Sequence, residues 1–141
     1  MSDESWGIQI AMLHKRGSQY IQDQLRPLGL GTGLHPYLLA LEGGCLHQEA
    51  LTQILMVDKA NTARALAKLE AMGLVARCQD EKDARVKQVT LTPRGVSLLE
   101  PIKNALQSWE TQLRQGLSPG EVETLGVLLQ NRARAATMIM P

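Results

Sequence analysis

The run from Asp58 to Gly95 constrains the fold of this chain more than any other segment. Asp58 is a residue type that caps helices, and the helical pattern after it lasts until Gly73, where a left-handed backbone is tolerated. Two short apolar stretches follow, Leu74–Gln79 and Val86–Leu91, with a polar, turn-like segment between them. This pattern predicts one helix and then a two-stranded hairpin.

Helices are predicted on both sides of this run. Apolar periodicity and capping residues give a helix over 6–26, a short helix capped by Thr32 and closed at Gly43-Gly44, a helix over 47–55, a helix over 93–115 kinked at Pro101, and a last helix that opens at the capping box 118–121. In the last helix, the stripe expected to face inward is Val122, Leu125, Leu129 and Ala133. A tight turn at Met56-Val57 joins helix 47–55 to the helix that follows.

Two helices joined by a tight turn and followed by a hairpin make a winged helix-turn-helix. The chain has 141 residues, of which 44% are hydrophobic and none is Phe, so its size fits one domain with a mainly aliphatic core. The sequence therefore predicts a mostly α (α+β) fold. The expected architecture is a winged helix-turn-helix with a two-stranded β wing and additional helices at both ends of the chain.

Positive charge gathers in the middle third of the chain. Residues 58–94 carry a net charge of +3, residues 1–57 carry −2, and residues 95–141 are neutral overall. If Thr62, Leu66 and Leu69 face the core, the opposite face of their helix carries side chains that donate to base edges and phosphates. These are Lys59, Asn61, Arg64 and Lys68. Alone they would fit a solvated surface, but the basic tip of the neighbouring hairpin favours contact with nucleic acid.

Other functional classes find little support in the sequence. It contains no nucleophile elbow, phosphate-binding loop or dinucleotide fingerprint. The histidines and cysteines lack the spacing of a metal site. We therefore expect no enzymatic activity, no metal and no cofactor. A signal peptide and a long apolar span are not evident, so the expected location is the cytoplasm, without a membrane partner.

The residues of the central run resemble the MarR family of bacterial regulators. The resemblance is carried by Asn61 to Gly95, and within it by Leu69-Glu70, Gly73-Leu74-Val75, Arg77, Asp83, Arg85, Leu91-Thr92 and Gly95. With the order of the helices included, it extends over nearly the whole chain. The wing motif and its flanks are the specific part of the match.

The resemblance implies one MarR-like domain over residues 1–141 that binds double-stranded DNA as a homodimer. Residues 32–92 would form the DNA-binding lobe, and residues 5–26 and 93–138 the dimerisation helices. The targets would be palindromic operators, and the usual role is that of a repressor. Within the wing, which also carries Lys82, Arg85 would enter the minor groove with Asp83 as its partner. From the residues alone, Asp83 could hold either Arg85 or Arg77.

Three positions depart from the family pattern. The wing has Ala84 where many members have a second arginine, which removes one contact. Met56 stands where glycine is frequent. The helix that follows Asp58 is the recognition helix of the family pattern, and the turn before it is expected to differ slightly in geometry. Lys59 replaces a common small polar residue, which should alter base preference.

The family resemblance also implies a small aromatic effector that releases the protein from DNA. Candidate lining residues are His14, Tyr20, His35, Tyr37 and Trp109. The alternative interpretation, which the residue types favour, is packing with the polar tips satisfied. Cys45 in a predicted loop and Cys78 in a predicted strand are expected to be reduced, small apolar residues without a redox role.

Two rival functions remain open at this point. A winged helix can bind another protein through the same surfaces, so a protein-interaction module without DNA binding is the alternative from a different class. A catalytic domain with a concealed site is a more remote one.

Overall fold

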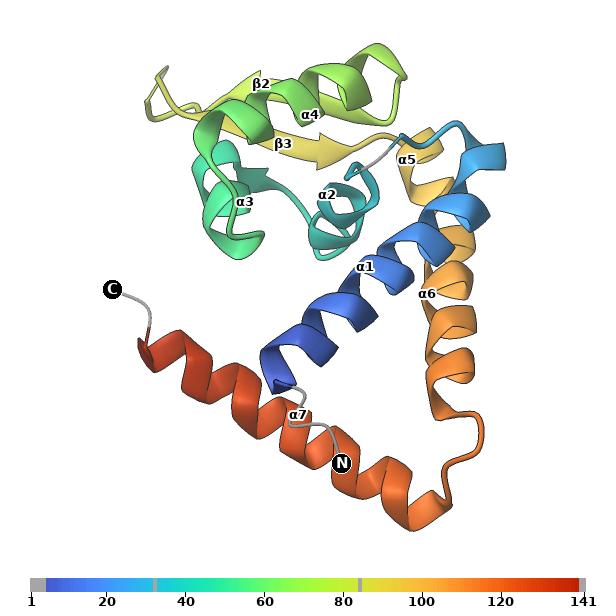
Figure 1. The fold of residues 1–141 in the computed structure, drawn as a ribbon. Helices are drawn as coiled ribbons and strands as arrows, with labels where there is room; N and C mark the ends of the chain where they lie inside the picture. The colour runs from blue at the N-terminus through green and yellow to red at the C-terminus, as the bar shows by residue number, and fades with distance from the viewer. Residues whose placement is uncertain (1–4, 32, 84, 140–141) are drawn as a thin grey trace. The chain divides into compact units, whose positions relative to one another are not determined.

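The computed structural model describes residues 5–31, 33–83 and 85–139. The helices are α1 (Trp6–Leu25), the 3-10 helix η1 (Arg26–Leu28), α2 (His35–Ala40), α3 (Gln48–Ile54), α4 (Lys59–Ala71), α5 (Pro93–Ser97), α6 (Leu99–Arg114) and α7 (Pro119–Ile139). The strands are β1 (Leu46–His47), β2 (Val75–Gln79) and β3 (Lys87–Leu91). The mostly helical winged architecture is thus confirmed, and Figure 1 shows α2, α3 and α4 around the small sheet. Thr32, the expected cap of the second helix, lies outside the described residues.

The sheet has three antiparallel strands in the order β1-β3-β2: the predicted two-stranded wing is formed by β2 and β3, and the short strand β1, which the sequence did not predict, joins it. Leu46 pairs with Val89 and His47 with Gln88 on one side of β3, and β2 pairs with the other side. The sequence pattern missed β1 because a two-residue strand shows no alternation. Its place is fixed by pairing with residues more than 40 positions later, so β3 becomes the central strand.

Helix α4 begins and ends as its local sequence predicts. The Asp58 side chain accepts a hydrogen bond from the backbone N–H of Asn61 at 2.6 Å, and Gly73 follows the helix with a φ of 74°. Met56, in the turn before α4, has a φ of 56°. This is the left-handed region that glycine adopts without strain, so at this torsion the turn keeps the conformation of a glycine despite the different residue.

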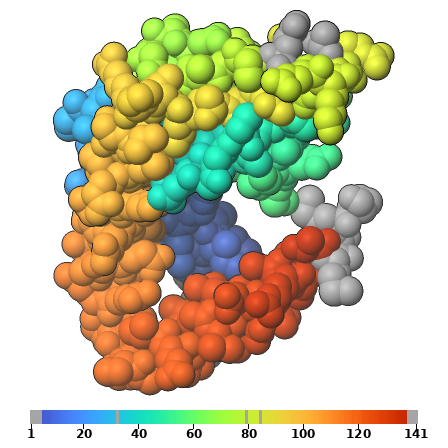
Figure 2. Space-filling model, turned by 180° about the vertical axis from the view of Figure 1, so that it is seen from behind, coloured from blue at the N-terminus to red at the C-terminus, as the bar shows by residue number. Residues whose placement is uncertain are grey.

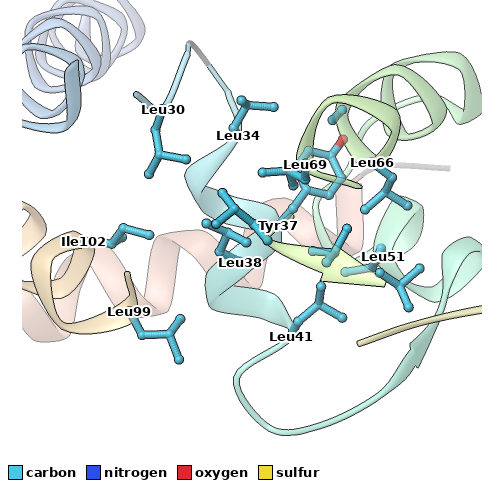
Figure 3. Packing of buried hydrophobic residues seen from close by; sticks show 14 of the residues in the cluster. Leu30, Leu34, Tyr37, Leu38, Leu41, Leu51, Leu66, Leu69, Leu99 and Ile102 are labelled. Atoms are coloured by element: carbon cyan, nitrogen blue, oxygen red, sulfur yellow. The ribbon is translucent and has the colours of Figure 1, made fainter. Parts of the chain in front are cut away.

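The core of residues 5–106 is built mainly from leucine side chains. Leu66 and Leu69 of α4 are fully buried and point toward Tyr37 of α2 and Leu51 of α3 (Figure 3). Ile102 of α6 is also fully buried in the same cluster. The inner face of α4 therefore packs as the periodicity predicts, and this packing decides which face of the helix remains in solvent.

The structure has two helices, α5 and α6, where one kinked helix was predicted over 93–115, so that prediction is wrong in its continuity. Thr92 caps α5 through a 3.1 Å hydrogen bond from the Gly95 N–H, as expected from its position before Pro93. The break comes at Leu98. Pro101 explains it, because proline has no N–H to donate to the carbonyl four residues earlier and its ring crowds that carbonyl, here Ser97.

The chain divides into two compact units, residues 1–106 and 107–141. In the second unit, the capping box of α7 is confirmed: the Ser118 N–H donates to Glu121 Oε1 at 2.9 Å, and the Glu121 N–H donates to Ser118 Oγ at 3.2 Å. The inward orientation expected for Leu125 and Leu129 is wrong for the single chain, since both are about half exposed. The described residues of this unit, the end of α6 and α7, contain no buried apolar side chain against which they could pack.

Gly95 stands at a very close approach of two backbone segments. A Cβ built there would lie 2.1 Å from the carbonyl oxygen of Leu74 and 3.3 Å from Leu91 Cδ2. The same carbonyl accepts a hydrogen bond from the Thr92 N–H at 3.1 Å, so it cannot move away without loss. Only glycine fits where α5 crosses the beginning of the hairpin.

Replacing Gly95 by alanine should therefore destabilise the protein by about 1–3 kcal/mol, the usual range for overpacking. Chemical denaturation followed by circular dichroism measures this loss. Gly43→Ala is the matched control, because a Cβ at Gly43 meets nothing within 4 Å. Equal stability of Gly95→Ala and Gly43→Ala would contradict the close approach.

Candidate DNA interface

The outer face of α4 is polar and basic. Lys59, Asn61, Arg64 and Lys68 are all exposed, while Thr62 is fully buried on the opposite side. Asn61, Arg64 and Lys68 are spaced by three and four residues and share one side of the helix. Within the part of the chain that the structure describes, Lys59, Arg64 and Lys68 form no ion pair, so their charges are available to an external anion.

A chain of hydroxyl groups around the buried Thr62 fixes the rotation of α4. The Thr62 hydroxyl oxygen lies 2.9 Å from that of Thr52 in α3 and 3.4 Å from that of Tyr37 in α2. Thr52 also lies 3.2 Å from the Gln48 carbonyl oxygen, which can accept its hydroxyl proton. Because a buried hydroxyl without a partner is costly, a rotation of α4 that breaks these contacts is unfavourable. The polar face is thereby held outward.

The wing is ordered by two aspartates. Asp83 Oδ1 accepts hydrogen bonds from the backbone N–H of Arg85 at 3.0 Å and from Arg85 Nε at 3.2 Å. The Arg85 side chain remains 92% exposed. Of the two arginines that Asp83 could hold, it holds Arg85. Asp83 thus restricts the guanidinium without covering it, which preserves its ability to bind another anion.

Asp80 holds the start of the same loop. Its Oδ1 accepts from the backbone N–H of Lys82 at 2.7 Å, and its Oδ2 lies 3.1 Å from His47 Nε2. The hydrogen bond from the Lys82 N–H, with a smaller contribution from His47, lowers the pKa of the Asp80 carboxyl below its usual value. Lys82 itself is exposed.

Arg77, the other arginine that the sequence offered as a partner of Asp83, contacts Glu70 instead. Its Nη2 donates to Glu70 Oε1 at 3.0 Å and joins β2 to the end of α4. This hydrogen bond, together with the positive charge of Arg77, lowers the pKa of the Glu70 carboxyl. The family motif Leu-Glu followed by Arg therefore corresponds here to a contact between the recognition helix and the sheet.

An open groove of about 680 Å³ lies between α3, the start of α4 and the wing. It brings Lys59 and Arg85, which are 26 positions apart in sequence, onto the lining of one depression. The groove is also lined by Lys87, His47 and Gln53, none of which was predicted from the sequence as a site residue. Lys87 could have been suspected from its charge, but its place depends on the pairing of Gln79 with Lys87, which no local pattern reveals. In Figure 2 the hairpin formed by β2 and β3 projects from the lobe.

The candidate effector residues belong to both units of the chain. Tyr37 is buried, and its hydroxyl is engaged with Thr62, which fits the packing interpretation. His14 is exposed and Tyr20 half-buried on α1, and Trp109 belongs to the second unit. His35 differs: its Nδ1 is buried without a hydrogen-bond partner, and burial lowers the pKa of its ring. The effector stays a prediction.

Cys45 and Cys78 are exposed free thiols. Among residues 5–31, 33–83 and 85–139, no three side chains of the His, Cys, Asp and Glu types are arranged to hold a metal ion. In the same residues, no helix is both long and apolar enough to span a membrane.

Known transcriptional regulators are similar to this chain. The family model described as the MarR family matches residues 35–86. The HTH-type transcriptional regulator BilQ of Clostridioides difficile is 31% identical over 124 residues, covering 86% of this chain and 83% of its own length. A MarR transcriptional regulator from Methanosarcina mazei is 32% identical, covers 95% of this chain and 97% of that chain, and superposes with a TM-score of 0.90.

A further solved structure bears on the interface. A mutant of MarR from E. coli, complexed with operator DNA, is 27% identical, covers 89% of this chain and 91% of that chain, and has a TM-score of 0.80. The relatives are transcriptional regulators and not enzymes. On the strength of its fold, its wing and these similarities, the chain belongs to the MarR family of transcriptional regulators.

Proposed function

We propose that this chain is a repressor that binds a pseudo-palindromic DNA operator as a homodimer. The observation that carries the proposal is the groove in which Lys59, at the start of α4, and Arg85, in the wing, line one depression. A regulator that reads DNA needs a recognition helix and a backbone-binding element held in fixed relation. The similar E. coli protein, which was solved in complex with operator DNA, supports DNA as the partner of this chain.

In the proposed complex, α4 lies in the major groove. Arg64 and Lys68 donate to guanine O6 and N7 or to nearby phosphates, and Asn61 pairs with adenine. Arg85 enters the flanking minor groove, where the negative potential increases as the groove narrows. The sugar–phosphate backbone between the two grooves then follows the basic groove beside Lys59. A two-fold dimer presents this surface twice, to half-sites about 10 base pairs apart.

Exposed apolar side chains support the homodimer. On α1 they include Trp6, which is 82% exposed, and Ile10, which is 58% exposed. On α7, Leu125 and Leu128 are 47% and 53% exposed. Large apolar side chains gathered on a helix face indicate an interface rather than a solvated surface. A second copy of this chain would cover these apolar faces, and a two-fold homodimer matches the symmetry of the proposed operator.

Arg85→Ala should weaken binding to the operator by about 1–3 kcal/mol, because it removes one specific groove contact from each protomer. Fluorescence anisotropy with a duplex selected by the wild-type protein measures the change. Arg26→Ala is the matched control, since Arg26 is likewise exposed and paired with an aspartate, Asp23, but lies outside the wing. Equal affinity of wild type and Arg85→Ala would contradict the docking proposed for the wing.

Replacing Leu125 and Leu128 together by glutamate should convert the dimer into a monomer, because two charges would enter each copy of the interface. Sedimentation velocity distinguishes one 15.5 kDa chain from two. DNA affinity should fall with the loss of the dimer. Gln130→Glu, which adds a charge at another exposed position of α7, should remain dimeric. A wild-type protein that sediments as a monomer would refute the dimer directly.

The same experiments separate this function from the alternative of a protein-interaction module. Such a module would keep its fold and its dimer but would show no preference among DNA sequences. Retention of selected duplexes at moderate salt, lost in Arg85→Ala, supports the regulator.

A further inference from the structure

His47 occupies a helix-capping position without capping the helix. It is the N-cap residue of α3, a position where Ser, Thr, Asp and Asn are preferred because their side chains accept a backbone N–H. The His47 side chain makes no such bond. Instead its Nε2 lies 3.1 Å from Asp80 Oδ2, at the base of the wing, and its side chain is 49% exposed.

The partners of His47 determine where its proton resides. Asp80 is also held as an anion by the Lys82 N–H, and an ionised carboxylate only accepts hydrogen bonds. The contact with Asp80 Oδ2 therefore requires a hydrogen on Nε2 of His47. Gln88 Nε2 donates to the same Oδ2 at 3.1 Å and lies 3.4 Å from His47 Nε2, as two donors that share one acceptor do. Nδ1 of His47 is left without a hydrogen-bond partner among the described residues and can take up a second proton.

The surroundings of His47 are those of the proposed DNA-binding groove. Lys59 of α4, Arg85 of the wing and Lys87 of β3 line the groove with it, and Glu49 of α3 is the acidic side chain among the lining residues. Asp80 faces the ring from the base of the wing, and the Cys45 thiol, before β1, donates to Gln88 Oε1 at 3.3 Å. Lysine and arginine keep their charge near neutral pH, whereas histidine is the side chain that changes its charge between about pH 5 and 8.

We propose that His47 is a proton-dependent contact to the DNA backbone, so that the protein binds DNA more tightly when His47 is protonated. One proton from solvent binds Nδ1, Nε2–H remains donated to Asp80, and the resulting imidazolium adds a positive charge to the groove. A phosphate in the groove stabilises the imidazolium over the neutral ring. The complex then binds protons more tightly than the free protein, and DNA affinity rises as the pH falls. This inference rests on the proposed function.

The test uses a duplex of arbitrary sequence, about 30 base pairs or roughly three helical turns long, because a phosphate contact does not depend on sequence. Wild-type affinity, measured by fluorescence anisotropy at constant ionic strength, should increase about three- to tenfold between pH 8 and pH 6. His47→Gln, which keeps a donor but does not titrate, should change less than about twofold. An unchanged dependence in His47→Gln overturns the proposal.

Asp80→Asn separates a charge effect from a structural one. This substitution removes the carboxylate beside the His47 ring, which makes protonation of His47 less favourable. The curve of DNA affinity against pH should therefore move to lower pH. A purely structural role of Asp80 in the wing would lower the affinity equally at every pH and would count against the proposal. Thermal unfolding of each variant checks that the fold is intact.

Nuclear magnetic resonance of the full chain provides a second readout that is independent of affinity. The ring signals of His47, titrated with and without the duplex, should show a higher protonation midpoint in the complex. An unmoved midpoint overturns the proposal while leaving DNA binding intact. Failure of the wild-type protein to bind any duplex at any pH would instead overturn the proposed function together with this inference.

Discussion

Burial of the inner face of α4 is the constraint on which the interface depends. Leu66 and Leu69 supply the apolar contacts, and Thr62 supplies a buried polar side chain, tied to the hydroxyls of Thr52 and Tyr37. Apolar contacts alone tolerate small rotations of a helix, whereas hydrogen bonds between hydroxyls have narrow limits of distance and angle. The combination holds one face in the core and leaves Arg64 and Lys68 in solvent.

The wing is attached to the same core through the beginning and end of the hairpin. Val75 and Val89 of the sheet are buried. The Leu74 carbonyl oxygen accepts a hydrogen bond from the Thr92 N–H, at the point where Gly95 allows the two backbone segments to approach closely. At the tip, regular pairing ends, and carboxylates hold the backbone and Arg85 instead. The wing therefore has a firm base and an exposed cationic end, which suits the minor-groove contact that we propose for it.

Local signals in the sequence predicted the parts of this structure that local interactions determine. Asp58, Thr92 and the pair Ser118 and Glu121 cap helices within a few residues of themselves, so their roles were visible in the sequence. β1 was missed because its partner β3 lies far along the chain. His47 was missed for the same reason, and Lys87 was missed because its place depends on the register that pairs it with Gln79. On α7, the apolar stripe was recognised, but its burial in a single chain was wrong, because periodicity identifies an apolar face without identifying what covers it.

The most direct test of the two-groove arrangement is selection of duplexes from a random DNA library by the wild-type protein, followed by sequencing. A fixed pair of recognition helices in a two-fold dimer predicts an inverted repeat with half-site centres about 10 base pairs apart. Insertion of Arg85 at each outer edge predicts flanking A·T-rich steps with a narrow minor groove. Retained duplexes without a shared inverted repeat would contradict the arrangement of α4 and the wing proposed for this chain.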